Sequence, residues 1–458
     1  MAIVNSNINI APNTQDFPPS TPLLGEARIA MNQNDFASSI KAGGFVGKDF
    51  PTPAPRFAAN TTAFSPDGKF LAGGGNSTPN FGIYDLSTNA PIKIADPTVL
   101  PQGTVYRITF SHDGKFLAVY HGTSPYLTIY NMNTGNPVKT TTPSSLPGTS
   151  FAALVFSPDS NFLAVLSSGS PYLAVYDMSS GSAIKTANPS TYPTGSASIA
   201  AFSPDGKFLA VAHSTSPFLT IYNMSTGNPV KFPNPTPLLT KTPNCLSFLP
   251  NNKFLMVGLS QSLTAIYDIS SGTPTRVPEP TFLPRSSVSR FMVIPNSERM
   301  IVMFDYAPNI EIYDISNEIP IKLEAVTIPY PATGAYLDFS SDGEIIAITA
   351  GTSSRTLNLY DTHTGAPLEP NSQIQSSLGN ITAVFFSPDN KFLAIGCSDS
   401  PYIMLYDVVS KDTIYPVTIT DVGFLSKAVT FKGFGFTREA LNKGDIGVID
   451  IIAEDIPK

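Results

Sequence analysis

The sequence predicts an all-β fold, a β-propeller of eight four-stranded antiparallel blades with irregular N- and C-terminal extensions. Two unrelated phrases carry this prediction, because each recurs eight times at one spacing of about 46 residues. The first is typified by Phe-Ser-Pro-Asp-Gly-Lys-Phe-Leu-Ala, and its leading apolar residues are Phe64, Phe110, Phe156, Phe202, Phe248, Ile294, Phe339 and Phe386. The second is an aliphatic residue followed by Tyr-Asp or Tyr-Asn, and its tyrosines are Tyr84, Tyr130, Tyr176, Tyr222, Tyr267, Tyr313, Tyr360 and Tyr406.

Each repeat contains four short strand candidates separated by turn residues. In the fourth repeat these candidates are Ser198–Phe202, Lys207–His213, Phe218–Met224 and Pro229–Phe232. Ser-Pro-Asp-Gly between the first two suits a tight turn, because proline presets φ and glycine accepts a positive φ. The second candidate is apolar without alternation, which indicates a strand buried on both faces. A four-stranded meander covered on both faces is typical of a propeller blade.

One repeat is too small to fold alone, so neighbouring blades must stack and close a ring. Eight complete repeats favour eight blades, and seven blades plus a displaced unit is the alternative. The predicted organisation is an N-terminal extended arm at 1–60, the propeller at 61–417, and a C-terminal latch or appended β element at 418–458.

The repeat phrase resembles that of the WD40-like and TolB-like propeller repeats. The chain lacks tryptophan, and tyrosine stands where the WD40 tryptophan would be. The fuller phrases His213-Ser214-Thr215-Ser216-Pro217-Phe218-Leu219 and Ser170-Pro171-Tyr172-Leu173 resemble repeats in virion structural proteins of tailed bacteriophages, often tail-associated ones. This resemblance implies a structural protein of a tailed phage particle.

Composition excludes several classes of function. Hydrophobic residues make up 42% of the chain, which is enough for a packed interior, and charged residues only 13%. The net charge of −7 offers no basic surface for a phosphate backbone, so we expect no nucleic-acid partner. No apolar run is long enough to span a bilayer, so we expect no membrane insertion. The N-terminus lacks the features of a secretory signal, which predicts synthesis and retention in the host cytoplasm until lysis.

No catalytic, cofactor or metal site can be read from the sequence. The four histidines are scattered, and His121 and His213 end second strands two blades apart. Cys245 and Cys397 lie in different repeats and are expected to be buried free thiols. The repeated aspartates after the first strands are explained by side chains that cap their own turns. The inner strands offer serine, threonine and apolar residues rather than the Glu, Asn and Asp ligands of a lactonase-like propeller enzyme.

Partner binding is expected where the blades differ from one another. In a meander, the loops after the second and fourth strands share one rim, and these loops vary most. We expect partner contacts in the arm and on this rim, at Ile8, Ile10, Phe17, Leu23, Leu24, Tyr126, Tyr172, Phe218, Tyr306, Arg355 and Tyr402. For the rim aromatics, packing against the adjacent blade is the competing interpretation.

These observations favour a non-enzymatic structural or binding protein of a tailed phage virion, a rigid disc attached through its terminal arms and variable loops. Its expected partners are other virion proteins, with a host surface glycan or receptor as a further candidate. The alternative is a bacterial extracellular propeller that acts as an adhesin or carbohydrate-binding module. The part of the virion, the copy number and the identity of the partner do not follow from the sequence.

Overall fold

The computed structural model describes most of the repeat region and little of the two ends. The described residues are 45–48, 59–76, 79–87, 91–143, 145–146, 150–259, 264–277, 287–304, 310–316, 320–327, 336–349, 357–368, 381–397, 403–408, 429–430 and 452–453. The chain divides into two compact units, one of residues 47–407 and one of residues 1–46 with 408–458. All regular structure in the described part is β, arranged in eight four-stranded sheets. The all-β class and the eight blades are thereby confirmed, and the seven-blade alternative is wrong.

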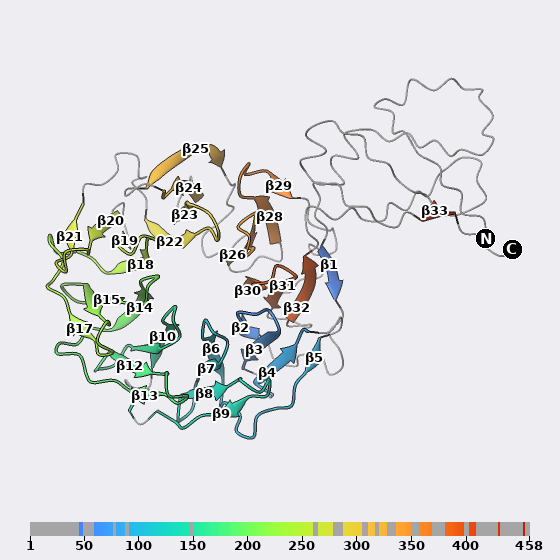
Figure 1. The fold of residues 1–458 in the computed structure, drawn as a ribbon, viewed down its shortest axis with the longest axis horizontal. Coiled ribbons are helices and arrows are strands. Elements are labelled where there is room, and N and C mark those ends of the chain that lie inside the picture. The colour runs from blue at the N-terminus through green and yellow to red at the C-terminus, as the bar shows by residue number, and fades with distance from the viewer. Residues whose placement is uncertain are drawn as a thin grey trace. The chain divides into compact units, whose positions relative to one another are not determined.

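The first strand of every blade lies on the inner side of the ring, and the next two strands follow it outward (Figure 1). The first strands are β2 (Ala59–Phe64), β6 (Val105–Phe110), β10 (Phe151–Phe156), β14 (Ala197–Phe202), β18 (Pro243–Phe248), β22 (Val288–Val293), β26 (Leu337–Phe339) and β30 (Ile381–Phe386). The second strands are β3 (Phe70–Gly75), β7 (Phe116–His121), β11 (Phe162–Ser167), β15 (Phe208–His213), β19 (Phe254–Leu259), β23 (Arg299–Phe304), β27 (Ile345–Thr349) and β31 (Phe392–Cys397). The third strands are β4 (Phe81–Asp85), β8 (Leu127–Asn131), β12 (Leu173–Asp177), β16 (Leu219–Asn223), β20 (Thr264–Asp268), β24 (Ile310–Asp314), β28 (Leu357–Asp361) and β32 (Ile403–Val408).

The fourth strands are short, and the eighth sheet takes its fourth strand from the other end of the chain. In the first seven sheets these strands are β5 (Ile92–Lys93), β9 (Val138–Lys139), β13 (Ile184–Lys185), β17 (Val230–Lys231), β21 (Thr275–Arg276), β25 (Ile321–Thr327) and β29 (Pro367–Leu368). The eighth sheet has the order β1-β32-β31-β30, so β1 (Phe45–Lys48) completes it. This strand falls inside the segment for which the sequence predicted an extended arm. It completes the last blade from the N-terminal side, where sequence reasoning had looked for a latch only after residue 417.

Within each blade the described strands pair antiparallel, and in every blade except the seventh the first strand contains a bulge near its start. In the fourth blade, Ala197 pairs with His213 and Ile199 pairs with Ala212, so Ser198 is the extra residue. The same register shift occurs one residue into β2, β6, β10, β18, β22 and β30. A bulge changes the direction of a side chain at the end of a strand. The residue at this position is therefore aimed differently from the rest of its strand.

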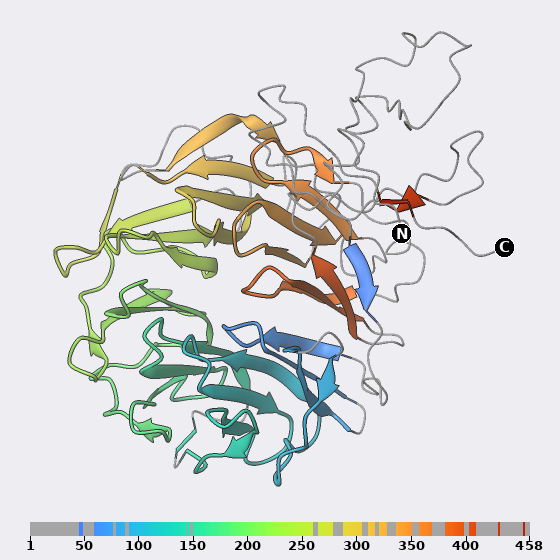
Figure 2. The same cartoon turned by 45° about the vertical axis from the view of Figure 1, so that its right-hand side comes forward.

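Apolar side chains on the facing sides of neighbouring sheets form the core. Leu173 and Val175 of the third blade, for example, pack with Leu209 and Val211 of the fourth. Between the last and first blades, Phe392 joins a cluster with Leu71, and β30 contacts β2. In both ribbon views the blue first sheet lies beside the red-brown last sheet (Figures 1 and 2). The ring is therefore closed by the same kind of packing that joins its other blades.

The alignment of the sixth repeat differs from the sequence prediction by one residue. In the sixth blade Val293 takes the leading apolar position, because Val293 pairs with Met300 as Phe248 pairs with Leu255. Assigning Ile294 to that position was wrong by one residue, since Ile294 and Asn296 stand where six other repeats have the serine and the aspartate of the turn. Cys245 is a buried free thiol, as expected, whereas the side chain of Cys397 lies outside the described part.

In the unit of residues 1–46 and 408–458, β33 (Val429–Thr430) and β34 (Ile452–Ala453) pair antiparallel with each other.

Candidate functional site

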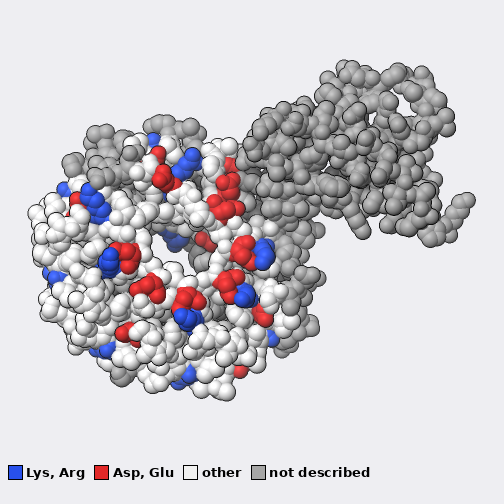
Figure 3. Space-filling model, viewed as in Figure 1, with Lys and Arg blue, Asp and Glu red and all other residues white. Residues whose placement is uncertain are grey.

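The turns after the first strands are held by a repeated serine and aspartate. In the fourth blade the Ser203 hydroxyl donates to Asp205 Oδ1 at 2.6 Å, and the Phe208 N–H donates to Ser203 Oγ at 2.9 Å. Burial alone would raise the pKa of Asp205, but its bonds with Ser203 and Lys207 hold that pKa below the usual value. The equivalent aspartates are Asp67, Asp113, Asp159, Asp342 and Asp389. Figure 3 shows charged side chains of both signs around the central opening. The bonds from serine to aspartate explain the repeated aspartates by their role in the turns.

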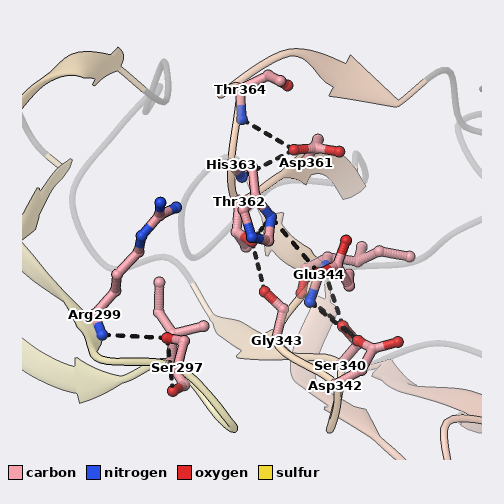
Figure 4. A network of polar contacts seen from close by, with 12 residues as sticks. Ser297, Arg299, Ser340, Asp342, Gly343, Glu344, Asp361, Thr362, His363 and Thr364 are labelled. Carbon is pink, nitrogen blue, oxygen red and sulfur yellow. Dashed lines mark hydrogen bonds and ion pairs between the residues drawn. The ribbon is translucent and has the colours of Figure 1, made fainter. Parts of the chain in front are cut away.

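Figure 4 shows how the two turn systems of one face meet in the seventh blade. The Thr362 hydroxyl donates to the carbonyl of Gly343, which joins the second hairpin turn to the first. Asp361 Oδ1 accepts the N–H of His363 at 2.8 Å, and His363 Nδ1 lies 3.7 Å from Glu344 Oε1. His363 therefore lies among turn contacts. In the described residues no group of three or more His, Cys, Asp or Glu is placed to hold a metal ion.

In blades two to five the repeated tyrosine of the third strand ties the blade to the loop before it. The Tyr222 hydroxyl donates to the Thr191 carbonyl at 2.9 Å, and burial raises the pKa of Tyr222 above its usual value. Tyr130 and Tyr267 make the same kind of bond to loop carbonyls. A buried phenol needs such a partner. In the sixth blade Tyr313 instead donates to the buried Glu311 carboxylate, at 2.6 Å.

Two of the histidines are buried and bonded to threonines of their own blades. His121 Nε2 lies 2.9 Å from Thr128 Oγ1, and His213 Nε2 lies 3.0 Å from Thr220 Oγ1. Burial lowers the pKa of His121, and it lowers that of His213 to about 4. Both rings are therefore neutral at physiological pH, and each belongs to the packing of a single blade.

The opposite rim, which we call the loop rim, consists of the loops after the second and fourth strands. Backbone bonds join these two kinds of loop, for instance from the Ser214 N–H to the Ser196 carbonyl at 3.0 Å. The Thr194 hydroxyl also donates to the Ser216 carbonyl at 2.8 Å. The same backbone bond recurs from Gly122 to Thr104. The variable loops thus share one surface, as the meander predicted.

Three of the predicted contact residues are equivalent aromatics on the loop rim. Tyr126, Tyr172 and Phe218 have φ values of 65°, 65° and 66°, unusual for bulky residues. All three are partly buried and pack against the core clusters between blades. This placement agrees with the competing interpretation and leaves part of each ring on the surface. The other predicted contacts, Ile8, Ile10, Phe17, Leu23, Leu24, Tyr306, Arg355 and Tyr402, lie outside the described residues.

The inner strands carry charged residues that sequence reasoning overlooked. Arg107 in β6 and Arg290 in β22 are exposed, and both follow the bulge position of their strand. Blades two and six face each other across an eight-bladed ring. Asp338 in β26 accepts the Phe386 N–H at 2.8 Å, and burial raises the pKa of Asp338 to about 6 despite this bond. The expectation of only serine, threonine and apolar inner strands was therefore wrong at these three positions.

A closed ring of eight four-stranded blades defines a β-propeller, and its repeats are of the WD40 and lactonase type. Residues 59–248 match the family described as lactonase, 7-bladed beta-propeller, and residues 370–407 match WD domain, G-beta repeat. Each match covers less than half of the chain. No curated protein matches the chain.

Two solved structures of one protein show the same fold at low sequence identity. Sqt1 from Chaetomium thermophilum is 14% identical with a TM-score of 0.57, over 78% of this chain and 97% of that one. The same protein bound to the N-terminus of the ribosomal protein L10 is 15% identical with a TM-score of 0.54, over 76% and 95% of the two chains. Kuenenia stuttgartiensis hydrazine synthase is 14% identical with a TM-score of 0.46, over 80% of this chain and 100% of that one.

Proposed function

We propose that the chain is a non-enzymatic structural and binding protein of a tailed phage particle, in which the propeller is a rigid disc that presents the loop rim to partners. One observation carries the binding role. The polar side chains that recur from blade to blade bond to turns and loops of the ring itself, as Ser203 and Asp205 do. The loop rim is where the blades differ and where backbone bonds hold the loops in place. Binding residues are often found on loops positioned by such a scaffold.

The terminal segments are the second part of the proposal. The arm residues Ile8, Ile10, Phe17, Leu23 and Leu24 are apolar anchors in a stretch without lysine or arginine before Arg28. Such a segment can bind a neighbouring protein through backbone hydrogen bonds and side-chain pockets. The phage assignment itself is supported by the resemblance of the Ser-Pro-Tyr-Leu and Ser-Pro-Phe-Leu phrases to virion repeats, and by the low content of charged residues.

The test is the protein content of purified virions of the phage that carries this gene. Mass spectrometry should find the chain in the particle at a fixed ratio to the other virion proteins. A chain that lacks residues 1–25 should fold with an unchanged melting temperature and fail to enter the particle. Absence of the full-length chain from virions would exclude the phage role, and normal incorporation of the truncated chain would exclude the arm as the anchor.

A further inference from the structure

Blade two differs from its near copies, blades three and four, at three positions that meet in space. The first is the bulge position of the first strand, the second lies near the end of the second strand, and the third is in the following loop. Blade two has Tyr106, Tyr120 and Gly122, blade three has Ala152, Leu166 and Ser168, and blade four has Ser198, Ala212 and Ser214. The blades differ elsewhere too, for example at Arg107, Ala153 and Ile199, but these three differences are the ones that gather around a single aromatic ring.

The three residues form a support for one exposed aromatic ring. Tyr106 is 43% exposed, and its ring centroid lies 5.3 Å from that of Tyr120, at an interplanar angle of 33°. A Cβ atom at residue 122 would lie 3.2 Å from Tyr106 Cε2 and 3.5 Å from its hydroxyl oxygen. A serine at 122, as in the neighbouring blades, would press on the ring. Glycine at 122 and tyrosine at 120 therefore together seat the ring of Tyr106.

The surface around this ring is rich in neutral hydrogen-bonding groups. Gln102 and Thr123 are exposed, and Thr104 is partly buried with its carbonyl bonded to the Gly122 N–H at 2.9 Å. The adjacent loops after the second strands of blades two to four contain no charged residue. The nearest cation by sequence is Arg107, whose guanidinium donates to the Tyr106 carbonyl at 3.0 Å.

We propose that Tyr106 is a stacking platform for a sugar ring, and that the loop rim over blade two binds a neutral glycan. The proposal deepens the binding function proposed above and depends on it. The face of a tyrosine ring is electron-rich, so the C–H groups of a pyranose can pack on it. Hydroxyl and amide groups placed around an apolar platform are the polar groups that orient such a ligand. A peptide partner would be the alternative occupant, and the absence of binding by both neutral glycans in the test below would overturn the glycan in its favour.

The experiment measures oligosaccharide binding to the full-length protein by saturation-transfer NMR and calorimetry. The probes are maltohexaose and N-acetylchitohexaose as neutral glycans, and a hyaluronan hexasaccharide as an acidic one. At least one neutral probe should bind, and Tyr106→Ala should weaken it by about tenfold or more, a loss typical of removing a stacked aromatic anchor. Gly122→Ser should weaken binding in the same direction because it displaces the ring. Tyr106→Phe keeps the ring and should bind almost as well as the parent.

Arg290→Ala is the matched control, since it removes an exposed inner-strand side chain of blade six. Its binding should equal that of the parent, and the melting temperatures of all variants should agree. The proposal is overturned if neither neutral probe binds, if Tyr106→Ala binds as tightly as the parent, or if only the acidic probe binds. Virion composition decides the proposed function independently: a chain found in virions that binds no neutral glycan refutes only this inference. A chain that binds glycan through Tyr106 but is absent from virions refutes only the phage role.

Discussion

The buried pair of His213 and Thr220 should make the ring sensitive to mild acid. His213 is fully buried, and its pKa of about 4 lies below the ordinary value of 6.5 because burial disfavours the charged ring. Below pH 6.5 the unfolded chain binds a proton that the folded chain does not, so stability present above pH 6.5 is lost as the pH falls toward 4. From these two values, the loss between pH 7 and pH 4.5 is about 2.5 kcal/mol.

The chain itself supplies the variant that tests this. Blade three has Ser167 and Ala174 at the equivalent positions, so His213→Ser with Thr220→Ala copies a pair that already fits the repeat. The free energy of unfolding is measured by urea denaturation at pH 7 and pH 4.5, followed by tyrosine fluorescence. Its decrease between the two pH values should be about 2.5 kcal/mol smaller in the double variant than in the parent. His213→Ser alone should also cost about 1–3 kcal/mol at pH 7, because it leaves the buried Thr220 hydroxyl without its partner. Equal acid losses in the parent and the double variant would refute the reasoning.

Three further perturbations have defined outcomes. Asp338→Asn should raise stability at pH 7 by about 1–3 kcal/mol. The folded pKa of Asp338, about 6 against 3.8, means that the parent loses stability as pH rises through this range, and urea titrations across it should show the slope vanish in the variant. Lys322→Met should destabilise by about 3–5 kcal/mol in urea denaturation, because it strands the buried Glu311 carboxylate 2.7 Å from the lost ammonium. Glu311→Thr with Lys322→Met should recover most of that loss, and a failure to recover would argue against the ion pair. Removing residues 1–48 should lower the melting temperature by several degrees where removing residues 1–25 does not, since only the longer deletion takes away β1; equal melting curves would show that β1 adds no stability.

The fold was predictable because its signal is redundant. The strand candidates of the fourth repeat match β14 to β17 within two residues at each end. Where the redundancy weakened, so did the prediction: in the sixth repeat, which lacks the serine and the aspartate of the turn, the alignment shifted to Ile294 instead of Val293. Strand β1 escaped notice because four residues with no repeat phrase carry no periodic signal, and their partner strand is more than 350 residues away.

The candidate site was less accessible to sequence reasoning. Tyr106 stands at a bulge, so its exposure depends on a local change of register that periodicity does not reveal. Arg107 and Asp338 are each the one charged residue in an inner strand that is otherwise neutral. A search for residues that recur in every blade does not detect such single substitutions. A position-by-position comparison of blades two, three and four would have found Tyr106, Tyr120 and Gly122 together, although not that they touch.

Because β1 lies near the N-terminus, it is synthesised long before β32, the strand with which it pairs. About 355 residues separate Lys48 from Ile403, where β32 begins, so at a synthesis rate of about 5–20 residues per second β1 waits roughly 20–70 s for the strand it joins. Throughout that interval the face of blade one that packs against the last blade, with Leu71 and Tyr84, is also uncovered. A second nascent chain on the same polysome offers an identical β32 edge. Crowded synthesis should therefore favour exchange of β1 between copies, and dilution should favour closed single rings.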